Sequence, residues 1–136
     1  MKLWNWFTQW GAAGNLGARG EALAAEHLRR ELGMKILVRN VRCPGGELDI
    51  IALDDDDMVF VEVRTRSSEE FTTPEATVTR RKQQFLVRSA QWFMRRKKLN
   101  RWNPRFDVVA VVWPNDGKPV IRHHRNAFSP RPRRRA

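Results

Sequence analysis

Three acidic residues, Glu21, Asp49 and Glu62, lie among apolar neighbours, where a carboxylate needs a partner. Asp49 and Glu62 belong to two segments that alternate polar and apolar side chains, as strands do. If the four aspartates 54–57 form the turn between these segments, Asp49 faces Glu62 across a hairpin. A β-bulge would shift this register. The spacing therefore predicts, on that condition, two carboxylates side by side.

Two carboxylates directly opposite each other repel and destabilise a sheet. A shared proton, the neighbouring Arg64 or a divalent cation could offset the repulsion, and a cation bound by both acids is favoured here. Because no Cys or His accompanies Asp49 and Glu62, these hard oxygen ligands suit Mg²⁺ or Mn²⁺. The same register places Glu47 opposite Arg64. The alternative is a polar, solvent-facing hairpin side with ion pairs, which the apolar neighbours disfavour.

Glu21 lies in a segment, residues 16–32, whose apolar period is that of a helix, and Gly33 is expected to end it. At 100° per residue, Glu21 falls on the same stripe as Ala24 and Leu28. An unpaired carboxylate is costly there, which makes Glu21 a candidate for the same site. Alternatively, a carboxylate near the first turn simply interacts with the helix dipole.

The elements that must position these acids form an α/β pattern. In order, we expect a helix at 16–32, strands at 35–41, 47–53 and 58–66, a helix beginning at Thr73-Pro74-Glu75 and running to about Lys98, and strands at 105–113 and 119–124. This order predicts a mixed β-sheet with helices on its two faces.

The length of 136 residues suits one domain, which we assign to residues 15–128. Residues 1–14 form an aromatic N-terminal extension, and the Pro/Arg-rich tail at 129–136 is expected to be disordered. The single cysteine, Cys43, cannot form an intramolecular disulfide, which favours the cytoplasm. No apolar run reaches the ~20 residues of a spanning helix, so no integral membrane association is expected.

The positive charge is concentrated in the second half of the chain. Lys and Arg number 26 against 15 Asp and Glu, a formal net charge of +11, and 13 of the acids lie between Glu21 and Glu75. The acid-free stretch 76–106 contains Arg80, Arg81, Lys82 and Arg88, which we take as candidates for binding a nucleic-acid backbone. The alternative is a solubilising surface. Tryptophans such as Trp92 could stack on unpaired bases, although packing in or beside the core is their commoner role.

Several motifs together resemble a known family. They are Gly17-x-x-Gly20-Glu21-x-x-Ala24, Asn40-x-Arg42, Gly46-Glu47-Leu48-Asp49-Ile50-Ile51, Phe60-Val61-Glu62-Val63-Arg64-Thr65-Arg66 and Phe106-Asp107-Val108-Val109-Ala110-Val111. In this order they resemble the YraN family, which is similar to Holliday-junction resolvases and other restriction-endonuclease-like nucleases. The resemblance implies a central mixed sheet flanked by helices. It also implies metal ligation by Asp49 and Glu62, with the Val63 carbonyl as a third ligand and Glu21 reaching the site through water.

One position departs from the pattern, because Arg64 stands where the resemblance implies a lysine that positions or activates the attacking water. A guanidinium stays protonated and cannot act as a base. Lys82 could replace that lysine if it points inward along its helix, but we expect it to snorkel to solvent instead.

Together these features predict a nucleic-acid-binding, metal-dependent endonuclease that hydrolyses DNA, branched DNA included, with Glu21, Asp49, Glu62 and Arg64 at the site. The alternative is a nuclease-fold module that binds nucleic acid without cutting it. A third interpretation uses the aromatic N-terminus and the basic face to join a membrane or a protein complex. A homodimer is a further candidate arrangement.

Overall fold

In the computed structural model, which describes residues 15–130, the chain begins with helix α2 (Leu16–Leu32). The side chain of Asn15 caps its start by accepting a hydrogen bond from the Ala18 N–H at 2.8 Å. Gly33 ends the helix in the left-handed conformation, with φ of 66°, and its N–H donates to the Leu28 carbonyl. The predicted helix and its glycine end are confirmed.

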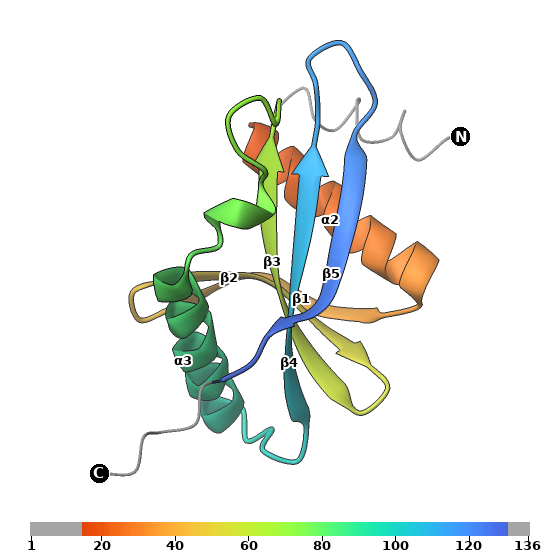
Figure 1. Cartoon of the computed structure of the whole chain (residues 1–136). Helices are drawn as coiled ribbons and strands as arrows, with labels where there is room; N and C mark the ends of the chain where they lie inside the picture. Colours follow the sequence, from red (N-terminus) through yellow and green to blue (C-terminus); the bar gives the residue numbers. More distant parts are fainter. Residues whose placement is uncertain (1–14, 131–136) are drawn as a thin grey trace.

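Five strands form one mixed sheet in the order β1-β2-β3-β4-β5 (Figure 1). They are β1 (Lys35–Cys43), β2 (Gly46–Asp54), β3 (Asp57–Arg66), β4 (Asn103–Val112) and β5 (Val120–Phe128). Neighbours are antiparallel except β3 and β4, which are parallel because helix α3 (Arg80–Arg96) connects them. The α/β class is confirmed, and the arrangement is consistent with a restriction-endonuclease-like fold.

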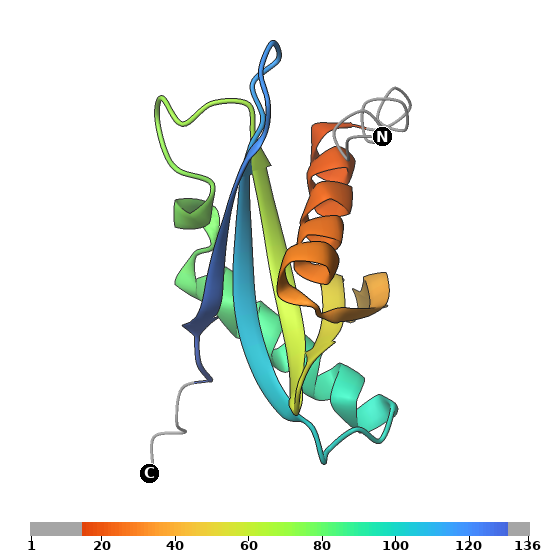
Figure 2. The ribbon, with the colours of Figure 1, turned by 90° about the vertical axis from the view of Figure 1, so that its right-hand side faces the viewer.

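The two helices cover opposite faces of the sheet, so the core has two layers (Figure 2). Strand β3 supplies both layers by strict alternation: Val59, Val61 and Val63 pack toward α2, whereas Phe60 packs toward α3. Phe60 contacts Phe93 of α3 edge to face, with ring centroids 6.2 Å apart. The central strand is therefore buried on both sides.

The helix expected to run unbroken from Pro74 is interrupted, and that prediction is wrong. A 3-10 turn, η1 (Glu75–Thr77), comes first, and the chain then leaves helical geometry at Val78, with φ of −82° and ψ of 78°. Thr79 starts α3 anew, because its hydroxyl accepts a hydrogen bond from the Lys82 N–H at 3.2 Å. Apolar periodicity did not reveal this cap, which places Lys82 in the first turn of α3.

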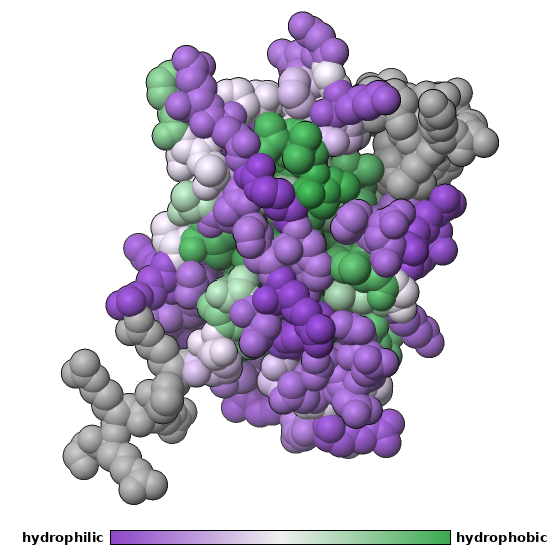
Figure 3. All heavy atoms as spheres, turned by 45° about the vertical axis from the view of Figure 1, so that its right-hand side comes forward, coloured by the Kyte–Doolittle hydropathy of each residue, from purple (hydrophilic) through white to green (hydrophobic). Residues whose placement is uncertain are grey.

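Two predictions concern chain outside the described range. The aromatic extension at 1–14 and most of the tail, residues 131–136, lie there. Within residues 15–130, no helix has the length and apolar character needed to cross a membrane. The face in Figure 3 is mainly hydrophilic, with apolar areas set among polar side chains.

Helix α2 lies against β3 at Gly20, where only a hydrogen atom fits. A Cβ added at Gly20 would lie 1.8 Å from Thr65 Oγ1 and 2.8 Å from Thr65 Cβ. Gly20→Ala should therefore lower the free energy of unfolding by about 1–3 kcal/mol, measured by urea denaturation, because α2 must shift away from the sheet.

Gly17→Ala is the matched control on the same helix, since its nearest contact is Asn15 Oδ1 at 3.5 Å. This variant should be neutral or more stable, as expected of alanine in an open helix position. Equal stability of the two variants would contradict the close approach at Gly20.

Candidate functional site

Asp49 lies where β2 separates from β3. The paired register runs from Asp54↔Asp57 to Ile50↔Val61, which confirms the hairpin register predicted around the aspartate turn. Beyond Ile50 a side chain replaces the main-chain hydrogen bonds between the two strands: Asp49 Oδ2 accepts a hydrogen bond from the Val63 N–H at 2.9 Å. A carboxylate thus replaces a main-chain carbonyl at the point where the strands part.

The predicted Glu47–Arg64 pair is wrong, because β2 no longer pairs with β3 at Glu47. Glu47 lies opposite Arg42 of β1, with Arg42 Nε and Glu47 Oε1 3.8 Å apart on an exposed surface. Arg64 instead contacts Glu62, with 3.2 Å between Nη2 and Oε1. Because β2 has left β3 by this point, the hairpin register cannot be extended to Glu47.

Glu62 is the most enclosed acid of the site, with a side chain only 5% exposed. Its Oε1 contacts both Arg64 and Lys82, the latter with 3.6 Å to Nζ. Its Oε2 is buried and receives no hydrogen bond from any residue in the range 15–130. Since a buried carboxylate oxygen without a partner is costly, Glu62 has an unmet need for a donor or a cation.

Lys82 points inward, so the expectation that it snorkels away is wrong. Its ammonium group lies near Glu62 and 4.8 Å from the centre of the Phe85 ring. Thr79, three residues before Lys82, caps α3 and sets where the helix begins, and so which way Lys82 faces. Lys82 is therefore an amine beside the acid pair, the inward position that the sequence left as the less favoured alternative.

Glu21 reaches Asp49 from the α2 side, so the three predicted acids come together around Asp49. Burial, followed by a hydrogen bond and charge repulsion from Asp49, raises the pKa of Glu21 to about 8. Burial and the charge of Asp49 raise the pKa of Glu62 to about 7, against the opposing effect of Lys82 and Arg64. At neutral pH this cluster therefore retains protons that ordinary carboxyls would have lost.

The four basic candidates on α3 do not all lie together. Arg81, Lys82 and Arg88 line one groove beside the turn between β1 and β2, whereas Arg80 is exposed and outside that lining. Only Lys82 also contacts one of the acids. Their predicted contact with nucleic acid remains a prediction.

Arg105 belongs to the basic stretch but is buried among acids. Its Nε and Nη2 each donate to Asp107, both at 3.0 Å, and its Nη1 lies 2.9 Å from Asp54 and from Asp57. His123 Nε2 lies 2.8 Å from Asp107 Oδ2. The network fixes the ends of β3 and β4, so this cation is structural. Sequence reasoning missed it, because Arg105 and Asp57 are far apart along the chain.

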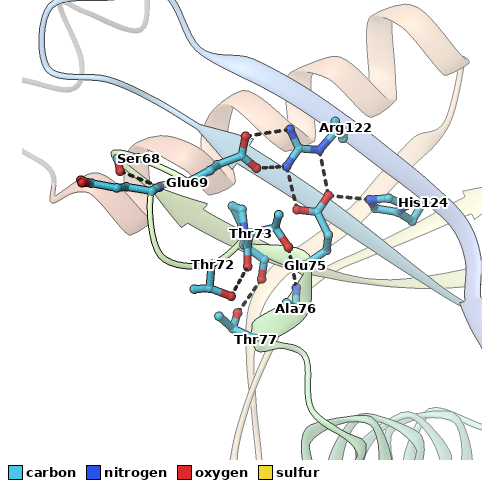
Figure 4. A network of polar contacts seen from close by, with 11 residues as sticks. Ser68, Glu69, Thr72, Thr73, Glu75, Ala76, Thr77, Arg122 and His124 are labelled. Atoms are coloured by element: carbon cyan, nitrogen blue, oxygen red, sulfur yellow. Dashed lines mark hydrogen bonds and ion pairs between the residues drawn. The ribbon is translucent and has the colours of Figure 1, made fainter.

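A second network, shown in Figure 4, fastens the connection between β3 and α3 to β5. Arg122 binds both Glu69 and Glu75, and His124 Nε2 lies 2.8 Å from Glu75 Oε2. The hydrogen bonds from Arg122 lower the pKa of Glu75 to about 2. This attachment holds η1 in place and therefore helps to set where α3 begins.

Comparison with known proteins agrees with the motifs. The profile of the uncharacterised protein family UPF0102 matches residues 20–111. A UPF0102 protein of Syntrophomonas wolfei is 46% identical over 115 residues, covering 83% of this chain and 96% of that protein. A UPF0102 protein of Syntrophotalea carbinolica is 45% identical over 114 residues, covering 84% and 91%. The chain belongs to the UPF0102 family. This is the YraN family of the sequence resemblance.

The donor set of this UPF0102 protein fits a hard divalent cation. Asp49 and Glu62 supply carboxylate oxygens, and the buried Glu62 Oε2 lacks a partner. Within residues 15–130, no three or more His, Cys, Asp or Glu side chains are arranged to hold a metal by themselves. Mg²⁺ commonly uses only one or two carboxylates, with water and phosphate oxygens completing its shell, so two acids are sufficient.

The raised pKa of Glu21 predicts how the stability of the metal-free protein depends on pH. A group whose pKa is higher in the folded than in the unfolded state contributes stability that is lost as pH rises, here from about 4.5 to about 8. Glu21→Gln removes this loss of stability at high pH, because glutamine does not ionise. In EDTA the variant should be more stable than the unsubstituted protein at pH 9, on the order of 1 kcal/mol by urea unfolding, and the difference should shrink toward pH 5.

Glu26→Gln on the same helix is the control, because the pKa of Glu26 is shifted in the opposite direction to that of Glu21. The hydrogen bond from Arg29, with further help from Arg30, lowers the pKa of Glu26, so its charge stabilises the fold at neutral pH. Its replacement should reduce stability at pH 7–9 by about 0.5 kcal/mol or less. A Glu21→Gln protein less stable than the original at pH 9 would contradict the assigned burial of that carboxyl.

Proposed function

We propose that this protein is a Mg²⁺- or Mn²⁺-dependent phosphodiesterase of the nuclease type, acting on DNA and on branched DNA in particular. The observation that carries the proposal is Glu62, a buried carboxylate beside Asp49 with one oxygen unpartnered and two cations at the other. A metal ion and a phosphate together would satisfy every one of these groups. The resemblance of the sequence motifs to those of restriction-endonuclease-like nucleases supports the same function.

Each side chain has a distinct role in this proposal. Asp49 and Glu62 would hold the ion, with the Val63 carbonyl as a third oxygen. The bound ion would act as a Lewis acid toward the phosphate and would lower the pKa of water. Arg64 would bind the phosphate, because the planar guanidinium fork can bind two phosphate oxygens at once. Glu21, next to Asp49, would hold a water molecule on the α2 side.

Lys82 would provide the amine that Arg64 cannot. An ammonium group can donate hydrogen bonds to water or phosphate and, unlike a guanidinium, can release its proton. The 3.6 Å contact between Lys82 Nζ and Glu62 Oε1 supports this position for it. The arginine at position 64 then need not abolish turnover, because the amine comes from α3 instead of β3.

The second candidate function is binding of nucleic acid without cleavage. The presence of Arg64 in place of lysine favours this function if no other amine substitutes for that lysine. In that case the unsubstituted protein is inactive and Arg64→Lys creates activity. In the enzyme we propose, the unsubstituted protein already cleaves.

Asp49→Asn tests the enzyme directly. Labelled junction, flap, single-stranded and duplex DNA are incubated with Mg²⁺ or Mn²⁺, and the substitution should reduce cleavage about 100-fold or more. The Asn carbonyl can still accept from the Val63 N–H, so the fold should persist. Titration calorimetry with MnCl₂ should show the corresponding loss of ion binding.

Asp55→Asn is the matched control for Asp49→Asn. Asp55 is an exposed turn residue of the same hairpin, with φ of 52°, a conformation that asparagine tolerates. This variant should cleave normally. Absence of cleavage on all substrates, or cleavage that survives Asp49→Asn, would refute the enzyme.

Lys82→Met distinguishes the role of Lys82 in cleavage from that of Arg64, the other cation beside Glu62. Methionine keeps a flexible apolar stem against Phe85 but removes the amine, so the single-turnover cleavage rate should fall about 10- to 100-fold. Arg64→Lys keeps a positive charge and should stay within a few-fold of the original. Lys97→Met, at the far end of α3, is the charge control and should be unaffected. A Lys82→Met protein with full activity would remove Lys82 from the mechanism.

A further inference from the structure

A groove with a volume of about 690 Å³ lies between the turn that joins β1 to β2 and one side of α3, from Thr79 to Trp92. The turn contributes a wall that includes Gly46, and α3 contributes side chains one and two helical turns apart, Phe85, Arg88 and Trp92 among them. The groove is thus a surface channel alongside the helix that carries Lys82.

Aromatic rings form part of this groove, and the backbone lies directly against one of them. A Cβ at Gly46 would lie 2.7 Å from Phe85 Cζ, so the turn can approach the ring only because residue 46 is glycine. Trp92, two helical turns after Phe85, presents a second half-exposed ring on the same side of the helix. Two aromatic rings therefore line one channel, each with a cation near it.

The charged side chains lining the groove are all positive. Arg81, Lys82 and Arg88 line it, and no acid is among its lining residues in the described chain. Arg96 adds a further cation, with its guanidinium carbon 5.5 Å from the centre of the Trp92 ring. Such a channel is complementary to a polyanion that also carries flat rings.

The groove is connected to the candidate active site through Lys82. The same ammonium group that lies 4.8 Å from the Phe85 ring centre lies 3.6 Å from Glu62 Oε1. A chain bound in the groove would therefore bring its backbone next to the acid pair.

We propose that this groove binds an unpaired nucleic-acid strand, with bases against Phe85 and Trp92 and phosphates against Arg81 and Arg88. In a duplex the bases stack on one another and are not available to protein rings, whereas an unpaired strand exposes them. The proposal rests on the proposed function and specifies its substrate class: single strands, flaps and unpaired loops. An intact duplex could contact only the cations.

The test measures binding without cleavage. Fluorescence anisotropy of the full-length protein in EDTA compares a labelled single-stranded DNA, an RNA of the same sequence and the corresponding duplex. The single strand should bind at least about ten-fold tighter than the duplex. Trp92→Leu should weaken single-strand binding about ten-fold, the effect expected of one lost base–aromatic stack, and change duplex binding less than two-fold.

Trp102→Leu is the matched control, because Trp102 is also a partly buried tryptophan packed against the same core layer but does not line the groove. It should leave both affinities unchanged. Arg88→Ala should flatten the salt dependence of single-strand binding, whereas Arg101→Ala, outside the groove, should alter it less. Urea unfolding of each variant verifies that the fold is intact.

Three results would overturn the groove assignment: equal affinity for duplex and single strand, an equal loss on both from Trp92→Leu, or equally good competition by a polyglutamate peptide. The last result would mean that charge alone is recognised.

Other results distinguish failure of the groove from failure of the proposed nuclease function. Selective single-strand binding without any cleavage would refute the nuclease but support the groove as a single-strand site. Cleavage of intact duplex that Trp92→Leu does not affect would support the nuclease but refute the groove.

Discussion

The repulsion between the carboxylates of Asp49 and Glu62, close together and largely out of water, is the constraint on which the rest of the site depends. The fold offsets it in three ways. The Val63 N–H donates to Asp49, two cations contact one oxygen of Glu62, and the pKa values of Glu62 and Glu21 rise so that protons are retained. When Glu62 and Asp49 are both ionised, the second oxygen of Glu62 has no donor among the described residues. Such an incompletely compensated cluster costs stability, which is typical of sites that bind a cation or perform chemistry.

The geometry of the sheet creates this arrangement. Strand β2 pairs regularly with β3 only as far as Ile50, and the departure beyond that point lets the Asp49 side chain occupy a place that a main-chain carbonyl would otherwise fill. The gap between the strands makes Asp49 accessible from both layers: Glu21 approaches from α2, while Glu62 faces the layer of α3. The close contact at Gly20 keeps α2 near enough for that approach.

Among the described residues, two sets of cations have different physical roles. Arg105 and Arg122 are bound by carboxylates and fasten strand ends and the β3–α3 connection, so their charges are neutralised locally. By contrast, Arg81 and Arg88 have no acid beside them in the groove that they line, and their field extends outward. The net charge of +11 is therefore a poor guide to where an anion would bind, and the distribution of acids decides it.

The sequence by itself determined the helix at 16–32, the five strands to within a few residues, the mixed sheet and the three acids, because alternation, apolar periodicity and turn residues are local signals. It also supported the hairpin register, since the aspartate turn fixes the pairing of the residues next to it. Only the tertiary structure decided the remainder. The loss of the Glu47–Arg64 pair follows from strand divergence, the inward turn of Lys82 follows from where Thr79 caps α3, and Arg105 is buried by acids from another strand end. The burial of Arg105 and the divergence of the strands depend on how segments distant in the chain pack together, which no local pattern encodes. The Thr79 cap is local, but the position of Lys82 beside Glu62 also requires α3 to pack against β3.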